Sequence, residues 1–146
     1  MEIKRTPTII AGKQAPYAKG TAVTGNQGFV WLSGSTGIET PTGRIPEDAG
    51  EQATIALQNI KARLEEYGAP LKNIVHVWQY IKGDFPDGIT ANPDYTRIKD
   101  AIEAFWKVNC PEFVMGNNPP ANTLLGVTAL ARKPLKLEIL VMAAIE

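Results

Sequence analysis

The segment LKLEILVMAAI, residues Leu135–Ile145, is apolar at nearly every position, and a single carboxylate, Glu138, lies within it. Alternate residues of a β-strand point to opposite faces of the sheet, so Leu137 and Leu140 belong to opposite faces. Both faces of this strand are therefore apolar, which is typical of a strand that is covered on two sides. FVWL, residues 29–32, has the same pattern. The sheet is thus predicted to be buried on both faces.

Two helices are predicted. Apolar residues recur at three-and-four spacing between Asp48 and Tyr67, and Gly68 follows as a helix end. The second predicted helix covers residues 92–109, with Asn92 as its N-cap and a proline at its first position.

The predicted strands come before, between and after these helices. AVTGNQGFVWLSG, residues 22–34, is interpreted as a hairpin around the turn 25–28. β-Branched and aromatic residues predict a strand at 73–83, and two last strands are expected at 122–130 and 135–144. Because crossover connections share one hand, both helices are expected on one face of a mixed sheet. The chain is predicted to be a single α+β domain, residues 1–146.

The second face of the sheet has no cover within this chain. An apolar surface of that size is expected to be buried against another protein surface. Copies of the same chain are the simplest partner, and closed symmetry is usual for such assemblies. A closed homo-oligomer is therefore predicted.

Composition limits the classes of function. Lys plus Arg and Asp plus Glu both total 15, so no global charge attracts nucleic acid or an anionic membrane. A small-molecule partner is expected, with no nucleic-acid or membrane partner. One cysteine and one histidine cannot make a zinc site of the common spacings, and no metal or cofactor is expected. No signal-peptide pattern or spanning segment is recognised, so a cytoplasmic location is expected.

Two polar residues follow a pair of prolines in NNPPANTLLGVTAL, residues 117–130. Prolines cannot donate to a sheet ladder, so they mark the edge where a strand begins, and Asn122 and Thr123 stand at its start. Glu138 is expected to point to the apolar face shared with Leu140 and Met142. Glu138 either pairs with a cation of a neighbouring copy or transfers protons. Desolvation would raise the pKa of its carboxyl group toward the range that is useful for proton transfer.

Three further residues are candidates to line a ligand site. Tyr17 follows a proline in APYAKG, expected to be a turn, and it is either a half-buried anchor or a cleft residue. Ser33 and Gly34 end an apolar strand, where a small residue lets a ligand approach backbone N–H groups. They are either an ordinary turn or part of the same site.

Several segments together resemble the Rid proteins (reactive intermediate deaminases), also called the YjgF or L-PSP endoribonuclease family. The segments are APYAKG, FVWLSG, the helix and strand from EQATIALQNIKARLEEYGAP to VWQYIKG, and PPANTLLGVTALARKPLKLEILVMAA. The resemblance implies a chorismate-mutase-like subunit in a homotrimer, with the three sheets as an inner barrel and small-molecule clefts between subunits. It also implies hydrolysis of enamines or imines, such as 2-aminoacrylate, without a cofactor. Glu138 matches the family's catalytic carboxylate, and Tyr17, Ser33 and Gly34 match cleft-lining positions.

One position departs from the family. Deaminating members typically have Pro-Ala-Arg-Ser or Pro-Ala-Arg-Thr, and the arginine grips the substrate carboxylate, whereas this chain has Asn122 there. Losing the bidentate, charge-assisted hydrogen bonds of the arginine is expected to weaken carboxylate binding by about 2 to 5 kcal/mol. Either Lys99 or Arg97 supplies the positive charge in place of the arginine, or both lie on a solvated helix face. His76 is either packed and hydrogen-bonded or a general base.

The sequence therefore predicts a small-molecule hydrolase or deaminase-like enzyme of a branch that lacks the usual arginine. Glu138 is the predicted catalytic group, and Asn122 with backbone N–H groups near Ser33 and Gly34 polarises a carbonyl or imine. One alternative is a non-catalytic trimer that binds or senses a metabolite. The other is a ribonuclease, which the balanced charge disfavours.

Overall fold

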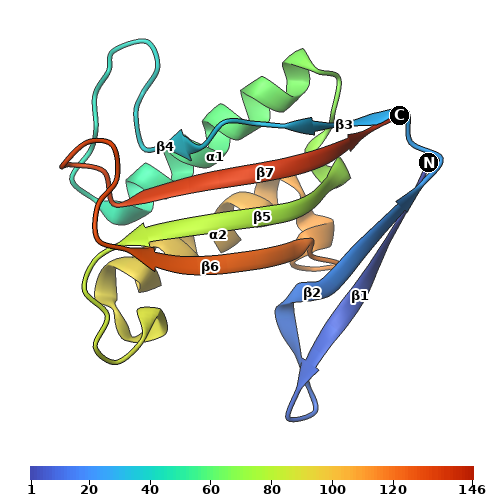
Figure 1. The fold of residues 1–146 in the computed structure, drawn as a ribbon, viewed down its shortest axis with the longest axis horizontal. Helices are drawn as coiled ribbons and strands as arrows, with labels where there is room; N and C mark the ends of the chain where they lie inside the picture. Colours follow the sequence, from blue (N-terminus) through green and yellow to red (C-terminus); the bar gives the residue numbers. More distant parts are fainter.

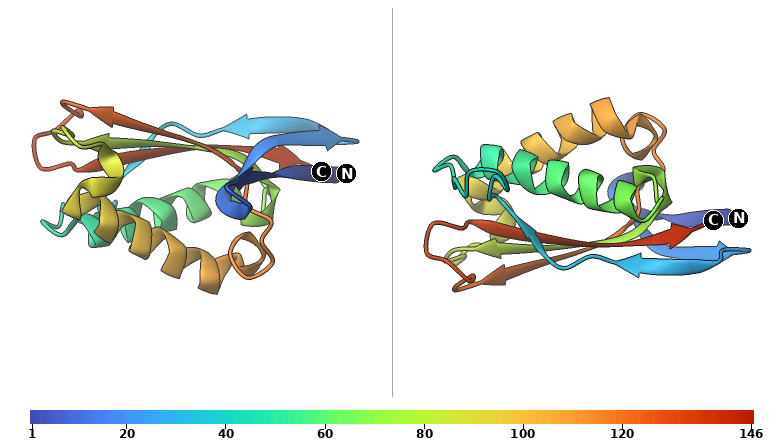
Figure 2. Two further views of the ribbon diagram at one scale, coloured as in Figure 1. Left: turned by 90° about the horizontal axis from the view of Figure 1, so that it is seen from below. Right: turned by 90° about the horizontal axis from the view of Figure 1, so that it is seen from above.

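The computed structural model describes residues 1–146 as one sheet with two long helices on one of its faces (Figures 1 and 2). The helices are α1, Ala49–Glu66, and α2, Pro93–Asn109. The strands are β1 (Glu2–Ile10), β2 (Lys13–Thr24), β3 (Gly28–Trp31), β4 (Ser35–Thr36), β5 (Ile74–Lys82), β6 (Ala121–Val127) and β7 (Leu137–Ile145). Short 3₁₀ turns cover Leu71–Asn73, Ile89–Ala91 and Pro111–Phe113.

The sheet order is β1-β2-β6-β5-β7-β3, and β4 also pairs with β7. β6 runs parallel to β2 and β5, and the other pairs are antiparallel, so the sheet is mixed. The predicted α+β class, with both helices on one face, is confirmed.

Both predicted helices are present, and each begins at a capping side chain. Asp48 caps α1, its side chain accepting a hydrogen bond from the Glu51 backbone N–H at 2.8 Å. Asn92 caps α2 in the same way, accepting from the Tyr95 backbone N–H at 3.2 Å, with Pro93 at the first helical position. These caps satisfy backbone donors that the first helical turn leaves unpaired.

The predicted hairpin at residues 22–34 is wrong. β2 does not pair with β3; it pairs with β1 through the two-residue turn Ala11–Gly12, and β3 pairs with β7. Both turn residues have positive φ, 48° and 76°, as a type I′ hairpin turn requires. The segment at Gly25 instead connects β2, the second strand of the sheet order, to β3 at the far edge. The N-terminal strand β1 was not predicted from the sequence.

The alternating pattern of the strands divides the sheet into two faces. On the helix-covered face, Val77 of β5 pairs with Val141 of β7, and both are buried in the core. The opposite face, here called the open face, carries the residues that alternate with the core-facing ones along each strand. Its members are Phe29, Trp31, His76, Trp78, Tyr80, Thr123, Leu125, Glu138, Leu140 and Met142.

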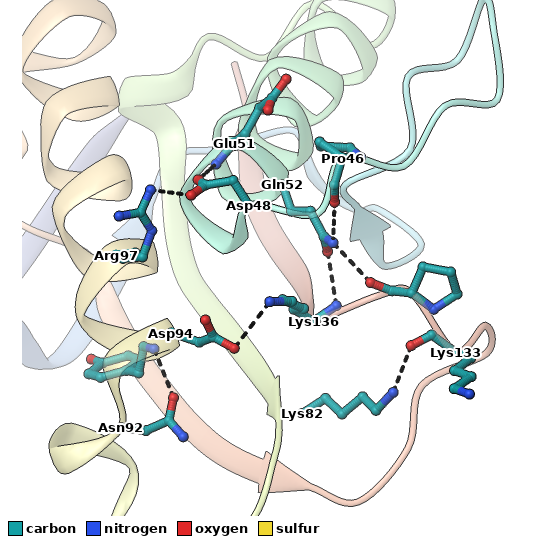
Figure 3. A network of polar contacts seen from close by, with 12 residues as sticks. Pro46, Asp48, Glu51, Gln52, Lys82, Asn92, Asp94, Arg97, Lys133 and Lys136 are labelled. Carbon is teal, nitrogen blue, oxygen red and sulfur yellow. Dashed lines mark hydrogen bonds and ion pairs between the residues drawn. The ribbon is translucent and has the colours of Figure 1, made fainter.

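A buried amide joins α1 to the segment before β7 (Figure 3). The Gln52 side chain is fully buried and donates to the carbonyl oxygens of Pro46 and Pro134 at 2.8 and 2.9 Å. It also accepts from the Lys136 backbone N–H at 2.9 Å. These bonds fix the start of α1 against the loop that leads to Glu138. Neither helix is both long and apolar enough to cross a membrane.

Candidate functional site

A cleft of about 820 Å³ lies between α2, the β2 strand and β6, with the 111–120 segment at one end. It forms where the sheet opens, because β2 and β6 pair only at Ala18 and Ala121 and then diverge (Figure 1). Core residues such as Leu57 and Ile139 are among its lining. A second, shallower groove of about 520 Å³ between α1 and α2 contains none of the predicted site residues.

Asn122 and Gln79 form an amide pair in the cleft wall. Asn122 pairs with Val77 across the β5–β6 ladder, so its side chain lies on the helix-covered face. The Gln79 Nε2 donates to the Asn122 Oδ1 at 2.8 Å, and both side chains are half-buried. Gln79 was not among the predicted site residues. Its signal in the sequence was a polar residue at a core-facing position of β5, between Val77 and Ile81.

Tyr17 lines the same cleft from the β2 side. Tyr17 lies within β2, so the turn that was predicted for this segment is wrong. Between the pairs Pro7–Ala18 and Ile9–Gln14, three residues of β2 stand opposite Thr8 alone. This bulge accommodates Pro16, which cannot donate to a ladder, inside a long strand.

The charged residues of the cleft come from α2. Lys99, Asp100 and Glu103 all line it, so acidic residues outnumber the one cation. Lys99 is exposed, and the ion pairs of the chain do not include it. Arg97 lies elsewhere, paired with Asp48 at the start of α1 (Figure 3). Of the two cations considered as substitutes for the arginine, only Lys99 reaches the cleft.

Glu138 lies on the open face, as its register with Leu140 and Met142 had predicted, and it pairs across the ladder with Tyr80 and Thr36. Its carboxylate packs against Gly34: a Cβ atom at that glycine would lie 1.8 Å from the Glu138 Oε1. Glu138 takes part in none of the chain's ion pairs.

Ser33 and Gly34 lie in a bulge beside Glu138. Between the pairs Trp31–Met142 and Ser35–Ile139, three residues face only two on β7. A bulge disturbs the ladder and leaves a residue without a partner opposite it. Ser33 is exposed in this bulge, and Gly34 is half-buried.

Thr123 does not share the cleft with Asn122, because consecutive strand residues point to opposite faces. It lies on the open face, where its Oγ1 is 2.9 Å from the His76 Nε2. The His76 ring stacks on Trp78 at a centroid distance of 4.0 Å, and burial lowers the pKa of His76. His76 therefore contacts Thr123 and Trp78 and does not reach the Asn122 cleft.

The six predicted site residues thus form two groups in the chain. Tyr17 and Asn122 line the cleft under α2, whereas the remaining four, Ser33, Gly34, Thr123 and Glu138, belong to the open face or its rim. The lone cysteine is in neither group. Burial raises the pKa of the Cys110 thiol to about 12, so the thiol stays protonated and is a poor nucleophile. No cluster of three His, Cys, Asp or Glu residues could hold a metal ion.

The chain is similar to proteins of one known family. The family model described as Endoribonuclease L-PSP matches residues 12–145. The chain is 33% identical over 132 residues to the 2-iminobutanoate/2-iminopropanoate deaminase of Salmonella typhimurium strain LT2, an alignment that covers 89% of this chain and 91% of that protein. The corresponding protein of Escherichia coli K12 is 32% identical over the same length.

Solved structures have the same fold. The structure of Escherichia coli TdcF with bound serine superposes with a TM-score of 0.66 at 26% identity, covering 97% of this chain and 94% of TdcF. The Rid-family protein YyfB of Yersinia pestis gives a TM-score of 0.74 at 21% identity, over 99% of this chain and 100% of YyfB, a likeness of fold alone. The predicted chorismate-mutase-like fold is confirmed, and the chain belongs to the Rid family, also known as the YjgF or L-PSP endoribonuclease family.

Proposed function

We propose that this protein is a deaminase-like hydrolase that acts on a small imine, enamine or related electrophile in a cleft between two copies of the chain. The observation that carries the proposal is the position of Glu138. Its carboxylate takes part in no ion pair and packs against Gly34 on a sheet face that no element of the chain covers. A carboxylate that lacks a counter-ion remains available to exchange a proton with a ligand or with water.

The proposed site needs a second copy. Glu138 and Gly34 belong to the open face, and Asn122 and Tyr17 to the cleft on the other side of the sheet. One protomer would supply the carboxylate and its neighbour the Asn122 cleft. A homotrimer is the proposed assembly, since closed rotation lets every subunit contribute both halves and covers each open face.

The proposed reaction is hydrolysis of a carbon–nitrogen double bond. Glu138 takes a proton from water as the water oxygen bonds to the imine carbon, and it passes this proton to the nitrogen to give a neutral carbinolamine. Glu138 then takes the hydroxyl proton of the carbinolamine and delivers it to the amine nitrogen as the C–N bond breaks, so that a ketone and ammonia are released. The Asn122 amide and backbone N–H groups near Ser33 and Gly34 would polarise the imine or product carbonyl.

Asn122 limits the substrate range of the proposed enzyme. An amide offers no charge-assisted fork, so a substrate carboxylate would lose about 2 to 5 kcal/mol of binding free energy relative to an arginine-containing cleft. That loss corresponds to about 30-fold or more in affinity, since each 1.4 kcal/mol is about tenfold. The protein is therefore proposed not to be an efficient deaminase of 2-aminoacrylate, although related proteins bear the name of 2-iminobutanoate/2-iminopropanoate deaminase.

Replacing Glu138 with Gln tests the proposed role. The substrate is first identified by screening generated imines and enamines for ammonia release. Glu138→Gln is then expected to reduce turnover at least 100-fold, the usual scale of general acid–base catalysis, about 10² to 10⁴. The matched control is Glu66→Gln, the same change at the exposed end of α1, which is expected to retain activity. Full turnover in Glu138→Gln would rule out the proposed role.

A non-catalytic metabolite-binding trimer is the second candidate function. The observation in its favour is the Asn122–Gln79 pair, which offers hydrogen bonds to a ligand but no group that carries a proton. Saturable binding across the imine and enamine panel, with no ammonia released, would favour this candidate over the enzyme.

Ribonuclease activity, which one of the family names suggests, is disfavoured by charge. The chain is neutral overall, and Asp100 and Glu103 line the cleft beside Lys99. RNA binding depends on cations that neutralise phosphates. Cleavage of RNA by protein that had been rigorously freed of nuclease contamination would restore this alternative.

A further inference from the structure

We propose that the cleft under α2 selects ligands that carry an uncharged carboxamide-type group, such as a primary amide, a ureido group or a lactam. This inference rests on the proposed function, because it names the substrate class of the same site. It concerns how the ligand is held, and it is tested by binding alone, without turnover.

The hydrogen-bonding groups of the Asn122–Gln79 pair lead to this class. A primary amide has one carbonyl acceptor and two N–H donors. One bond, from Gln79 Nε2 to Asn122 Oδ1, joins the pair, and no other hydrogen bond of the chain uses these two amides. The Asn122 Nδ2 group and the Gln79 Oε1 therefore remain available in the cleft wall.

This result does not depend on how the two amides are oriented. If oxygen and nitrogen were exchanged in both amides, the bond would run the other way. One amide would still present its NH₂ group and the other its carbonyl oxygen. The wall thus offers a donor beside an acceptor in either case. A carboxamide, ureido or lactam group carries a carbonyl oxygen and an N–H on adjacent atoms, which can satisfy both.

A carboxylate fits this wall less well. An ionised carboxylate only accepts hydrogen bonds, so it would leave the carbonyl oxygen of the pair without a donor. An acceptor that loses water and gains no partner reduces affinity. The charges of the cleft add to this effect, because Asp100 and Glu103 face one cation, Lys99. Among ligands of one shape, the neutral amide is therefore the better match.

The other walls suit a small planar group. Tyr17, Tyr95 and Trp106 line the cleft, and aromatic side chains supply flat apolar surface. Ligand sites commonly combine such apolar walls with a few oriented polar groups.

The test compares two ligands with the same carbon skeleton, pyruvamide and pyruvate. Each is titrated into the whole chain, and binding is followed by NMR through the ¹⁵N signals of the side-chain amides. Pyruvamide is expected to bind at least tenfold tighter than pyruvate and to shift the signals of Asn122 and Gln79. Gln79→Met, which removes the pair at similar volume, is expected to abolish the preference. Gln58→Met makes the same change on the exposed side of α1 and is expected to keep it.

Asn122→Arg is expected to reverse the preference in favour of pyruvate, because it introduces a bidentate cation. Equal or tighter binding of pyruvate by the wild-type protein would overturn the proposal, and so would an unchanged preference in folded Gln79→Met. Loss of pyruvate binding in Lys99→Met, combined with a wild-type preference for pyruvate, would identify Lys99 as the anion-binding group instead.

The same titration separates this inference from the proposed enzymatic role. Glu138→Gln is expected to lose turnover but keep the preference for pyruvamide. If that variant keeps both, the enzymatic proposal fails and the ligand class stands. If Glu138→Gln loses turnover, and both this variant and the wild-type protein are found to prefer pyruvate, the ligand class fails and the enzymatic proposal stands.

Discussion

At the scale of single residues, the contact between Gly34 and Glu138 determines how the carboxylate can be presented. A side chain at position 34 would occupy the space of the Glu138 carboxylate, because a Cβ atom there would lie 1.8 Å from its Oε1 and 2.5 Å from its Cδ. The atoms in the way belong to a flexible side chain and not to the backbone. A substitution there is therefore expected to displace the acid more than to unfold the protein.

Gly34→Ala is accordingly expected to reduce turnover at least tenfold, while the midpoint of thermal unfolding changes by only a few degrees, about 1 kcal/mol or less. Kinetics on the identified substrate and thermal denaturation measure the two effects. Gly28→Ala is the matched control, because Gly28 begins β3, the edge strand that leads to Gly34, and a Cβ atom added at Gly28 would meet no atom within 4 Å. An unaltered rate in Gly34→Ala would contradict a role for this contact.

His76, on the open face, is expected to make the stability of the folded protein depend on pH. Burial lowers its pKa below the ordinary value of about 6.5, so the folded state binds a proton less readily than the unfolded chain. Its contribution to stability is complete above about pH 6.5 and is lost as pH falls through that value toward the lower folded pKa.

The unfolding equilibrium is therefore expected to shift toward the unfolded state by up to tenfold per pH unit below about pH 6.5, and by less where solvent screens the half-exposed ring. Urea unfolding at pH 7.5 and pH 5.5 measures the shift. His76→Gln, which can still bond to Thr123, is expected to lose this dependence, and His76 is the only histidine of the chain. Identical pH profiles for the two proteins would disprove this assignment.

At the scale of secondary-structure elements, Gln52 attaches α1 to the segments on either side of it. Its two donated bonds and one accepted bond reach the loop before α1 and the approach to β7. Both segments matter for the candidate site, since β7 carries Glu138 and the loop before α1 continues from β4.

Gln52→Leu is expected to lower the free energy of unfolding by about 3 kcal/mol, because a side chain of similar size removes three hydrogen bonds and leaves backbone groups without partners. Chemical denaturation measures the change. Gln58→Leu, at an exposed position of the same helix, is expected to change it by less than about 0.5 kcal/mol. A loss in Gln52→Leu as small as in this control would show that water replaces the bonds.

At the scale of the whole molecule, the open face is the main surface that the fold leaves uncovered. Helices lie only on the other side of the sheet (Figure 2). Trp31 is 67% exposed, and Phe29 and Leu125 are 40% and 46% exposed. Their exposure in the single chain supports the proposal that copies of the protein cover this face.

Trp31→Lys is expected to convert the proposed trimer into monomers and to abolish activity, since each proposed site needs two copies. Sedimentation at working concentration measures the assembly, and ammonia release measures activity. Val108→Lys places the same charge on α2 at a residue that is 82% exposed and is expected to leave both unchanged. A wild-type protein that sediments as a folded monomer would contradict the two-copy site.

Local periodicity, capping residues and alternation were enough to predict the helices, the central strands and the open face. Asp48 and Asn92 marked the helix starts, and the alternation in residues 135–145 placed Glu138 beside Leu140 and Met142. The pairing of the strands, in contrast, is set only when the whole sheet assembles. The β1–β2 hairpin and the β3–β7 pairing join segments whose local patterns do not specify partners.

The three-dimensional fold likewise sets how the candidate residues are grouped. It joined Asn122 to Gln79, 43 positions away, and placed Tyr17 in the same cleft. It also separated Asn122 from Thr123, which face opposite sides of β6. A local pattern states which face of its own strand a residue occupies. Which residues meet across strands depends on long-range register and on the bulges at Pro16 and Gly34, and these are set when the whole sheet packs against its helices.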